Sequence, residues 1–221
     1  SRYCNARNRG SILKYRLVLS DVDSTLIDQE VIDLLGRMAG KEKEISEITS
    51  RAMAGELDFS DALRSRVSLL DGLPASVLEE VTDSITLSPG ALELKMFCRT
   101  NGIFFGAVSG GFIQILRNMT YFEDLDYLEA NFLEVIDNRL TGKVSGPIID
   151  RKAKADHLER FADSLNIRLE DTIAIGDGAN DLSMIQSAGL GVAFRGKEIL
   201  RNAATLSIEK SLSELIEFLE R

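Results

Sequence analysis

The 221-residue sequence has no tryptophan and contains only three prolines, two cysteines and one histidine. Three prolines leave no proline-rich linker, and we find no internal repeat or low-complexity segment. Cys4 and Cys98 are too far apart in sequence for a CxxC metal or redox motif, and two cysteines cannot build a disulfide-rich scaffold. We therefore expect both cysteines to be reduced, structural thiols.

Long apolar runs are also absent. No run approaches the roughly 18 residues that a membrane-spanning helix needs, and the first residues, SRYCNARNRG, lack the apolar stretch of a secretory signal. Hydrophobic residues nevertheless make up 44% of the chain and charged residues 28%, which is typical of a soluble globular protein of one or two domains. We expect a cytoplasmic protein without a membrane or an obligatory protein partner.

Positive charge is scarce, because 26 Lys and Arg stand against 35 Asp and Glu, giving a net charge of -9. The first 16 residues hold five of the basic residues and no acidic one, so the rest of the chain is more acidic than the whole. An acidic surface repels a phosphate backbone, which argues against nucleic acid as a partner. We expect residues 1–14 to form a flexible basic tail and assign it no function.

Apolar runs typical of buried strands recur along the chain, at residues 17–19, 103–108, 173–175, 190–194 and 205–208. Helical spacing of apolar residues fills most of the intervals, at residues 112–119, 181–188 and 212–219. Such alternation predicts an α/β fold, a parallel sheet with right-handed crossovers. Residues 132–144 break the pattern, since two short β-like runs flank Asp137-Asn138 and predict a hairpin.

Residues 31–86 show only helical patterns, and four helices are predicted there. The third begins near Asp58 and the fourth near Pro74, with Ser76 and Glu79 at capping-box spacing. Helices inserted after the first strand form a subdomain that sits over the sheet. The predicted domains are a tail at 1–14, a catalytic core at 15–30 and 87–221, and a helical cap at 31–86.

Carboxylates and small polar residues directly follow three of the predicted strands. DVDST follows the first run, SGG the second and GDGAND the third. Because ligands of open parallel sheets bind beyond the carboxyl ends of the strands, we expect these residues to converge on one edge. Four crowded acids repel one another unless a hard cation lies among them, and Mg²⁺ suits carboxylates together with a phosphate oxygen. The sequence therefore predicts Mg²⁺ and a phosphorylated ligand.

Two further features favour an anion site. Ser109 and the two glycines after it offer a hydroxyl and unobstructed N–H groups before a predicted helix, and Lys154 lies near the start of a helix that begins around Asp150. Each signal alone is weak, since a DxD can be a turn and Lys154 a solvated residue. The order DxDST, SGG, Lys, GDGxND, always at strand ends or helix starts, argues for one shared site.

These motifs resemble the signatures of the haloacid dehalogenase superfamily. DVDSTL, SGGF, KAKADHL and GDGANDLSM are similar to those of its phosphoserine phosphatase family, and so is ITSRAMAGELDFSDALRSRVSLLDGLP in the helical insertion. The resemblance implies the HAD fold, a Rossmann-like parallel sheet core with an inserted α-helical cap. Ser20 departs from the family, which usually has an aromatic or large apolar residue there. Longer relatives carry an N-terminal regulatory domain, and we expect no control through one here.

The resemblance also implies roles for the acidic residues. Asp21 becomes the nucleophile and Asp23 the general acid and base. Mg²⁺ is expected on the carboxylates of Asp21 and Asp177 and on the backbone carbonyl of Asp23, with Asp181 and Asn180 supporting. Such chemistry needs a raised pKa at Asp23, while the metal keeps Asp21 ionised.

Phosphoryl and substrate contacts follow from the same resemblance. Lys154, the Ser109 hydroxyl and the amides of Gly110 and Gly111 are expected to meet the phosphoryl oxygens.

The helical insertion is expected to confer specificity. Arg66 takes the substrate carboxylate, Glu30 takes its ammonium group, and Phe59 and Met53 shield the site. Without the resemblance, the pattern favours Phe59 and Met53 as core residues and Arg66 as a surface cation whose stem packs on the protein.

The implied activity is Mg²⁺-dependent hydrolysis of O-phospho-L-serine to L-serine and phosphate through an aspartyl-phosphate, a step of serine biosynthesis. Two enzymatic alternatives stay open: transfer of the phosphoryl group to homoserine, and hydrolysis of another small phosphomonoester. A non-enzymatic alternative is a signalling module with a phosphorylated aspartate, but Asp23 argues against it by speeding turnover of that group. Asp181 occupies the third glycine position of a dinucleotide fingerprint, and no GK[ST] motif occurs, so neither NAD nor ATP is implied.

Overall fold

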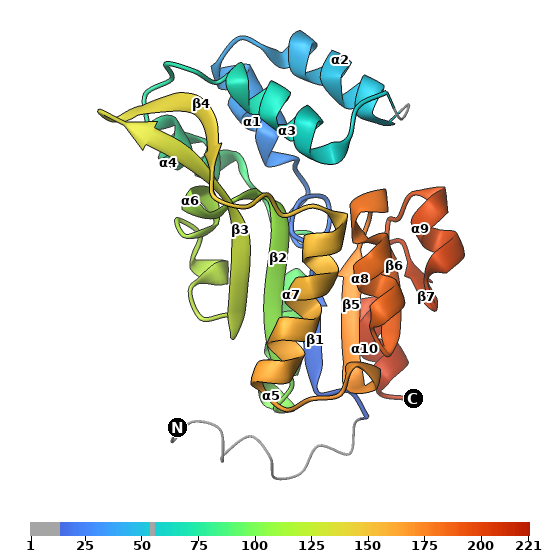
Figure 1. The fold of residues 1–221 in the computed structure, drawn as a ribbon. Coiled ribbons are helices and arrows are strands. Elements are labelled where there is room, and N and C mark those ends of the chain that lie inside the picture. Colours follow the sequence, from blue (N-terminus) through green and yellow to red (C-terminus); the bar gives the residue numbers. More distant parts are fainter. Residues whose placement is uncertain (1–13, 54–55) are drawn as a thin grey trace.

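The structure is a computed structural model that describes residues 14–53 and 56–221. Seven strands form one sheet in the order β4-β3-β2-β1-β5-β6-β7 (Figure 1). All neighbouring strands are parallel except β3 and β4. The strands are β1 (Leu17–Ser20), β2 (Phe104–Phe112), β3 (Tyr127–Ile136), β4 (Arg139–Ser145), β5 (Thr172–Gly176), β6 (Leu190–Phe194) and β7 (Leu206–Ile208). The parallel α/β sheet is therefore confirmed, with strands at the five predicted apolar runs, whereas residues 127–131 of β3, which pair in parallel with β2, were not predicted.

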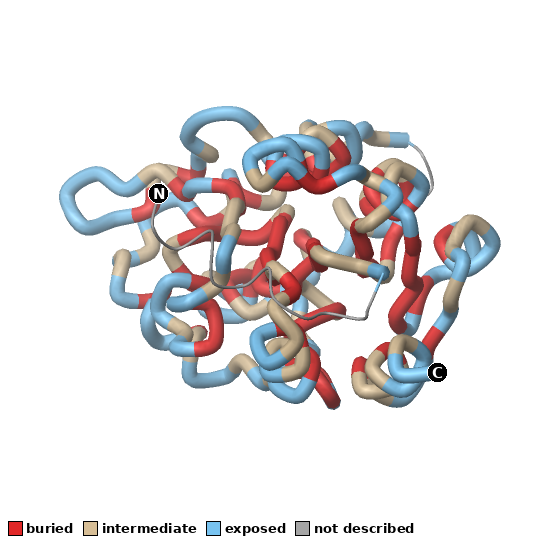
Figure 2. Tube along the Cα trace, turned by 90° about the horizontal axis from the view of Figure 1, so that it is seen from below, coloured by how far each residue is buried: buried red, intermediate tan, exposed pale blue. Residues whose placement is uncertain are grey.

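Helices cover both faces of this sheet, which explains why the central strands are continuous apolar runs. Val18 of β1 belongs to the apolar cluster that includes α5 and α10, whereas its neighbours Leu17 and Leu19 belong to the cluster that includes α7 and α8. Buried segments accordingly gather in the interior, with exposed helices and loops around them (Figure 2). The core helices are α5 (Ala91–Thr100), α6 (Ile113–Leu116), α7 (Arg151–Ser164), α8 (Leu182–Ser187), α9 (Glu198–Ala203) and α10 (Ser213–Leu219), with the short 3-10 turns η2 (Thr120–Phe122), η3 (Leu169–Asp171) and η4 (Ala179–Asp181).

The helical insertion lies between β1 and α5, beyond the carboxyl ends of the strands (Figure 1). It contains α1 (Val31–Met38), α2 (Glu42–Met53), α3 (Phe59–Ser68), α4 (Val77–Glu80) and the 3-10 turn η1 (Val81–Ser84). As expected, α3 begins at Asp58, whose carboxylate accepts the N–H groups of Ser60 and Asp61 at 2.6 and 3.2 Å. The domain boundaries at 31 and 86 stay a prediction.

The predicted capping box before the fourth helix is wrong. Ser76 already has helical dihedral angles and its side chain caps no N–H group. Its hydroxyl donates instead to the Glu80 carboxylate at 3.2 Å, because Glu80 rather than Glu79 lies above it one turn along the helix.

The predicted helix at 112–119 is mostly wrong as well. Phe112 ends β2, which continues through the two glycines, and α6 covers only Ile113–Leu116. The sheet register shifts between Ser109 and Phe112, so the strand bulges at the glycines and then resumes pairing with Asn131. Pairing with β3 thus overrides the helical spacing of these apolar residues.

The hairpin is confirmed, with Asp137 and Asn138 at φ 48° and 58° in a two-residue turn between β3 and β4. It reaches the insertion, since Leu140 of β4 donates its N–H to Leu73 at 2.9 Å and accepts that of Gly72 at 2.8 Å. The insertion is therefore held at one side by β4 and at the other by its two chain connections to the core.

Cys98 is buried and unbridged, and burial raises the pKa of its thiol to about 12, as expected for a structural residue. Cys4 and residues 1–13 of the predicted tail lie outside the described residues. Within the described residues, no helix has both the length and the apolarity that crossing a membrane requires.

Candidate active site

A cavity of about 460 Å³ lies between the sheet edge and the helical insertion. It brings together predicted site residues from both parts of the chain: Asp21, Asp23, Glu30, Phe59, Arg66, Gly110, Gly111, Asp177 and Asn180. Ser109, Lys154 and Asp181 are completely buried beside it. The Met53 side chain lies outside what the structure describes, so its predicted shielding role stays a prediction.

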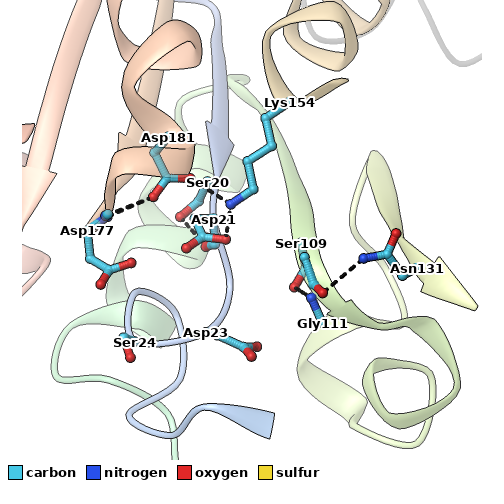
Figure 3. A network of polar contacts seen from close by, with 12 residues as sticks. Ser20, Asp21, Asp23, Ser24, Ser109, Gly111, Asn131, Lys154, Asp177 and Asp181 are labelled. Atoms are coloured by element: carbon cyan, nitrogen blue, oxygen red, sulfur yellow. Dashed lines mark hydrogen bonds and ion pairs between the residues drawn. The ribbon is translucent and has the colours of Figure 1, made fainter. Parts of the chain in front are cut away.

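Lys154 joins two of the carboxylates (Figure 3). Its Nζ lies 2.6 Å from Oδ1 of Asp21, directly after β1, and 2.6 Å from Oδ1 of Asp181. The other oxygen of Asp181 accepts the N–H groups of Asp177 and Gly178, both at 3.1 Å. Asp181 therefore shapes the loop after β5, and Lys154 holds this loop against Asp21.

Burial and neighbouring acids raise the pKa of Asp21 and of Asp177. Burial, followed by the charge of Asp181, raises the pKa of Asp21 well above its usual range, and Lys154 opposes this shift. Burial and then Asp181 also raise the pKa of Asp177 to about 6, against the pull of Lys197. For Lys154, burial lowers the pKa, but Asp181 and Asp21 outweigh it and the net shift is upward.

A cation would relieve this repulsion, and the residues present fit one. Asp21, Asp177 and Asp181 each offer a carboxylate oxygen, and these oxygens lie within 4.8 Å of one another. Carboxylates are ligands for hard divalent cations.

Asp23 has surroundings unlike those of Asp21. Its Oδ2 accepts the N–H of Val31 at 3.0 Å, while its Oδ1 is buried and has no hydrogen-bond partner in the described structure. Burial, followed by the charge of Glu30, raises the pKa of Asp23 to about 8. Its carboxyl group is thus protonated near neutral pH and can donate a proton into the cavity.

The glycines of SGG leave room that a side chain would fill. A Cβ at Gly110 would lie 3.2 Å from the Phe59 ring, and one at Gly111 would lie 3.1 Å from an Asp23 oxygen. The Gly111 N–H donates to the Ser109 hydroxyl at 2.8 Å, which fixes the bulge (Figure 3). A substituent at either glycine would therefore crowd the cavity.

Asn131 is a site-shaping residue that sequence reasoning missed. Its side chain is buried, donates to the Gly110 carbonyl at 2.9 Å and accepts the N–H of Ile149 at 2.8 Å. It thereby ties the glycine bulge to the segment that leads into α7 and Lys154. The predicted β-like segment begins only at residue 132, one position after Asn131, so no signal in the sequence pointed to this residue.

The insertion supplies Arg66, which lines the cavity but forms no ion pair with a carboxylate of the described residues. Its guanidinium donates to the Ala62 carbonyl at 3.2 Å and to the Thr49 hydroxyl at 3.4 Å. Burial lowers the pKa of Arg66, and Glu30 is the first of the nearby acids that counteract this. Glu30 accepts the Ser24 hydroxyl at 2.7 Å. A partly buried cation that pairs with no carboxylate of the described residues, and that lines the same cavity as Asp21 and Asp177, can bind an anionic group of a ligand.

Sequence reasoning also missed Lys197, Arg151, Asp33 and Thr49, all of which line the cavity. The Lys197 N–H donates to the Asp177 carbonyl at 2.8 Å. Lys197 follows β6 at the same sheet edge, so inspecting every strand end, rather than three, would have found it. His157 does not line the cavity and hydrogen-bonds to the Tyr127 hydroxyl at 2.7 Å.

The sequence and the fold are similar to those of known proteins. The chain is 48% identical over 204 residues to a phosphoserine phosphatase of Streptomyces coelicolor, covering 92% of this chain and 50% of that protein. It is 48% identical over 205 residues to a phosphoserine phosphatase of Streptococcus thermophilus, covering 92% and 95%. The chain thus spans about half the length of the Streptomyces relative and almost all of the Streptococcus one.

A solved structure described as a phospho-aspartyl intermediate analogue of phosphoserine phosphatase superposes with a TM-score of 0.86 at 42% identity, covering 93% of this chain and 99% of that one. The profile of the haloacid dehalogenase-like hydrolases matches residues 18–186, a span that contains Asp21, Lys154 and Asp177. With the sheet, the ordered motifs and the profile in agreement, the chain is a member of the haloacid dehalogenase-like hydrolase family.

Proposed function

We propose that the chain is a Mg²⁺-dependent phosphatase that hydrolyses O-phospho-L-serine to L-serine and phosphate through an aspartyl-phosphate on Asp21. The observation that carries the proposal is that one cavity contains the Lys154-bound Asp21 and, from the helical insertion, an Arg66 that pairs with no carboxylate of the described residues. The names of the similar phosphatases support the same substrate.

In the first half-reaction an oxygen of Asp21 attacks phosphorus, a new O–P bond forms, and the bond from phosphorus to the serine oxygen breaks. Asp23 donates its proton to that oxygen, which leaves as the serine hydroxyl. In the second half-reaction Asp23 takes a proton from water, and the resulting hydroxide attacks the aspartyl-phosphate. Phosphate leaves, and both carboxyl groups return to their starting states.

Lys154 and the Gly110 amide stabilise the charge on the phosphoryl oxygens. Lys154 is held by two carboxylates, so its ammonium group needs no reorganisation when charge develops. The Ser109 hydroxyl, which accepts from Gly111, can turn its own proton toward a phosphoryl oxygen.

The metal assignment follows from the chemistry of the donors. Asp21 and Asp177 would hold Mg²⁺ together with the backbone carbonyl of Asp23, and Asp181 and Asn180 would support them. Bound there, the ion supplies positive charge that offsets the repulsion between Asp21 and an incoming phosphate dianion.

Specificity comes from the insertion. Arg66 binds the substrate carboxylate and Glu30 its ammonium group, while Phe59 and Met53 exclude water. We propose accordingly that residues 31–86 act as a cap domain over the core.

The experiment is a phosphate-release screen over phosphoserine, phosphothreonine, phosphotyrosine, phosphoglycolate and sugar phosphates, with and without Mg²⁺ and homoserine. We expect phosphoserine to have the highest kcat/KM and release to require Mg²⁺. Accumulation of phosphohomoserine would instead indicate a transferase, and a long-lived phosphoprotein without turnover would indicate a signalling module. A role in serine biosynthesis, a cytoplasmic location and the lack of an obligatory protein partner stay predictions.

A further inference from the structure

The chain passes between the core and the insertion twice, and the two passages are paired with each other. We call residues 26–29 and 86–88 the neck. Ile27 and Leu87 form an antiparallel bridge, and the Asp28 N–H donates to the Thr86 carbonyl at 3.0 Å. The Gln29 side chain adds two hydrogen bonds to Thr86, each 2.9 Å long. The neck is thus a small two-stranded unit that carries the insertion.

Asp28 connects the neck to the core. Its carboxylate accepts the hydroxyls of Thr86 and Ser88, both at 3.3 Å, and pairs with the Arg195 guanidinium, Nη1 to Oδ1, at 3.0 Å. One acidic side chain therefore touches both the second neck segment and a residue that follows β6.

Arg195 is itself firmly held by the core. Its N–H donates to the Ile208 carbonyl of β7 at 2.9 Å, and its guanidinium donates to the carbonyls of Glu209 and Lys210 at 3.3 and 3.4 Å. Its φ of 48° is a left-handed conformation that costs energy for a residue other than glycine. Arg195 therefore keeps a backbone conformation that its residue type does not favour, and its guanidinium reaches Asp28 in the neck.

The two ends of this connection lead into the active-site cavity. On the core side, Lys197 lines the cavity and donates its N–H to the Asp177 carbonyl at 2.8 Å. On the insertion side, the neck continues into Glu30, which lines the cavity, and Val31, whose N–H binds Asp23. A shift of the neck relative to Arg195 would therefore move Glu30 and the insertion relative to the metal-binding edge.

We propose that Asp28 and Arg195 are positioning residues: their ion pair fixes the neck against the loop after β6, so that Glu30 and Arg66 meet the substrate bound at Asp21. This inference rests on the proposed function. The two side chains are 38% and 39% exposed, so the pair contributes little to global stability and acts on the orientation of the insertion.

The kinetic test uses Asp28→Asn, Arg195→Gln and the double variant, each with phosphoserine and with p-nitrophenyl phosphate, which lacks the carboxylate and ammonium groups. We expect each single variant to lower kcat/KM for phosphoserine about two- to fivefold, the range that a half-exposed ion pair supports, with less than about a 1.5-fold change for p-nitrophenyl phosphate. The double variant should lose no more than the single ones, because both remove the same contact.

Arg168→Gln is the matched control. Arg168 is also an exposed arginine, paired with Glu170 and Asp171, but it lies before β5, at the other end of the strand from the cavity. It should leave both substrates unchanged. Additive losses in the double variant, equal losses on both substrates, or the same loss in Arg168→Gln would each overturn the inference.

Hydrogen exchange supplies a readout independent of turnover. Arg195→Gln should speed exchange of the amides in residues 26–30 and 86–88 and leave those of β5 unchanged. If phosphoserine proves not to be a substrate while neck exchange still rises, the proposed function fails and the positioning role of the pair stands. Unchanged exchange in the neck would overturn the positioning role, whatever the substrate.

Discussion

Replacing Arg66 by alanine tests the substrate assignment directly. Arg66 lies in the cavity without a carboxylate partner among the described residues, and burial already lowers its pKa. The Ala62 carbonyl and the Thr49 hydroxyl hold its guanidinium in place, so little ordering is needed when a carboxylate binds. Arg66→Ala should therefore remove a prepared, charge-assisted contact to phosphoserine.

The size of the loss follows from the exposure of the site. Truncating one partner of a buried, hydrogen-bonded charge pair costs about 2 to 5 kcal/mol, or roughly 30-fold to several thousand-fold in kcat/KM. Arg66 is only partly buried, which places the expected loss in the lower half of that range, about 30- to 300-fold. Hydrolysis of p-nitrophenyl phosphate should change little, because that substrate has no carboxylate.

The assay measures kcat/KM for both substrates in Arg66→Ala and in Arg64→Ala. Arg64 is a suitable control, because it lies on the same helix, is exposed and pairs with Asp61 at 3.7 Å on the outside of the insertion. Near-normal kcat/KM for phosphoserine in Arg66→Ala, or an equal loss on both substrates, would refute the reasoning. The aspartyl-phosphate mechanism would survive that result, since it depends on the core alone.

Other predictions concern the core. Asp21→Asn should reduce phosphate release to background because it removes the nucleophile, and substantial residual turnover would mean that water attacks directly. Asp23→Asn should slow phosphoserine hydrolysis more than that of p-nitrophenyl phosphate, whose leaving group needs little protonation; equal losses in kcat would point to a structural role. A chelator should abolish activity and added Mg²⁺ should restore it; full activity in excess chelator would contradict this. Ca²⁺ should inhibit, because a larger ion tolerates extra ligands and can bind both oxygens of Asp21. Asn131→Ala should lower the free energy of unfolding by about 1 to 3 kcal/mol, measured by denaturant titration. It should also reduce kcat, because the Gly110 carbonyl loses its hydrogen bond to Asn131. An unchanged kcat would show that Asn131 contributes to stability alone.

The sheet edge could be predicted from the sequence because its geometry follows from local patterns. A buried parallel strand is a short apolar run, and the residue after it lies at the carboxyl edge, so the positions of Asp21 and Asp177 follow from the apolar runs alone. The same rule placed Gly111 at this edge, although β2 continues through it to Phe112. We could predict that the motifs converge without knowing how distant elements pack against one another.

The parts that could not be predicted depend on register and on contacts between distant segments. Asn131 reaches Gly110 only because β2 bulges against β3, and the same bulge turned Phe112 from a predicted helical residue into a strand residue. Arg195 contacts Asp28 across 167 positions of sequence through a left-handed backbone that no propensity favours. Periodicity describes neighbours along one element, and none of these contacts is of that kind.

The different roles that we propose for Asp21 and Asp23 could not be predicted from their spacing either. The two carboxyl groups are separated by one residue in DVD, so spacing alone gives them equal chemistry. Burial raises the pKa of both groups, and the charge of Asp181 raises that of Asp21 further. Lys154 of α7 opposes this shift by donating to Asp21, whereas Asp23 keeps one oxygen without a donor among the described residues and faces the charge of Glu30, which favours its protonated form. A nucleophile must be an anion and a general acid must hold a proton, so the difference in roles comes from the elements that each carboxyl group faces. Because Glu30 belongs to the connection into the insertion, the segment that we propose to select the substrate also raises the pKa of Asp23.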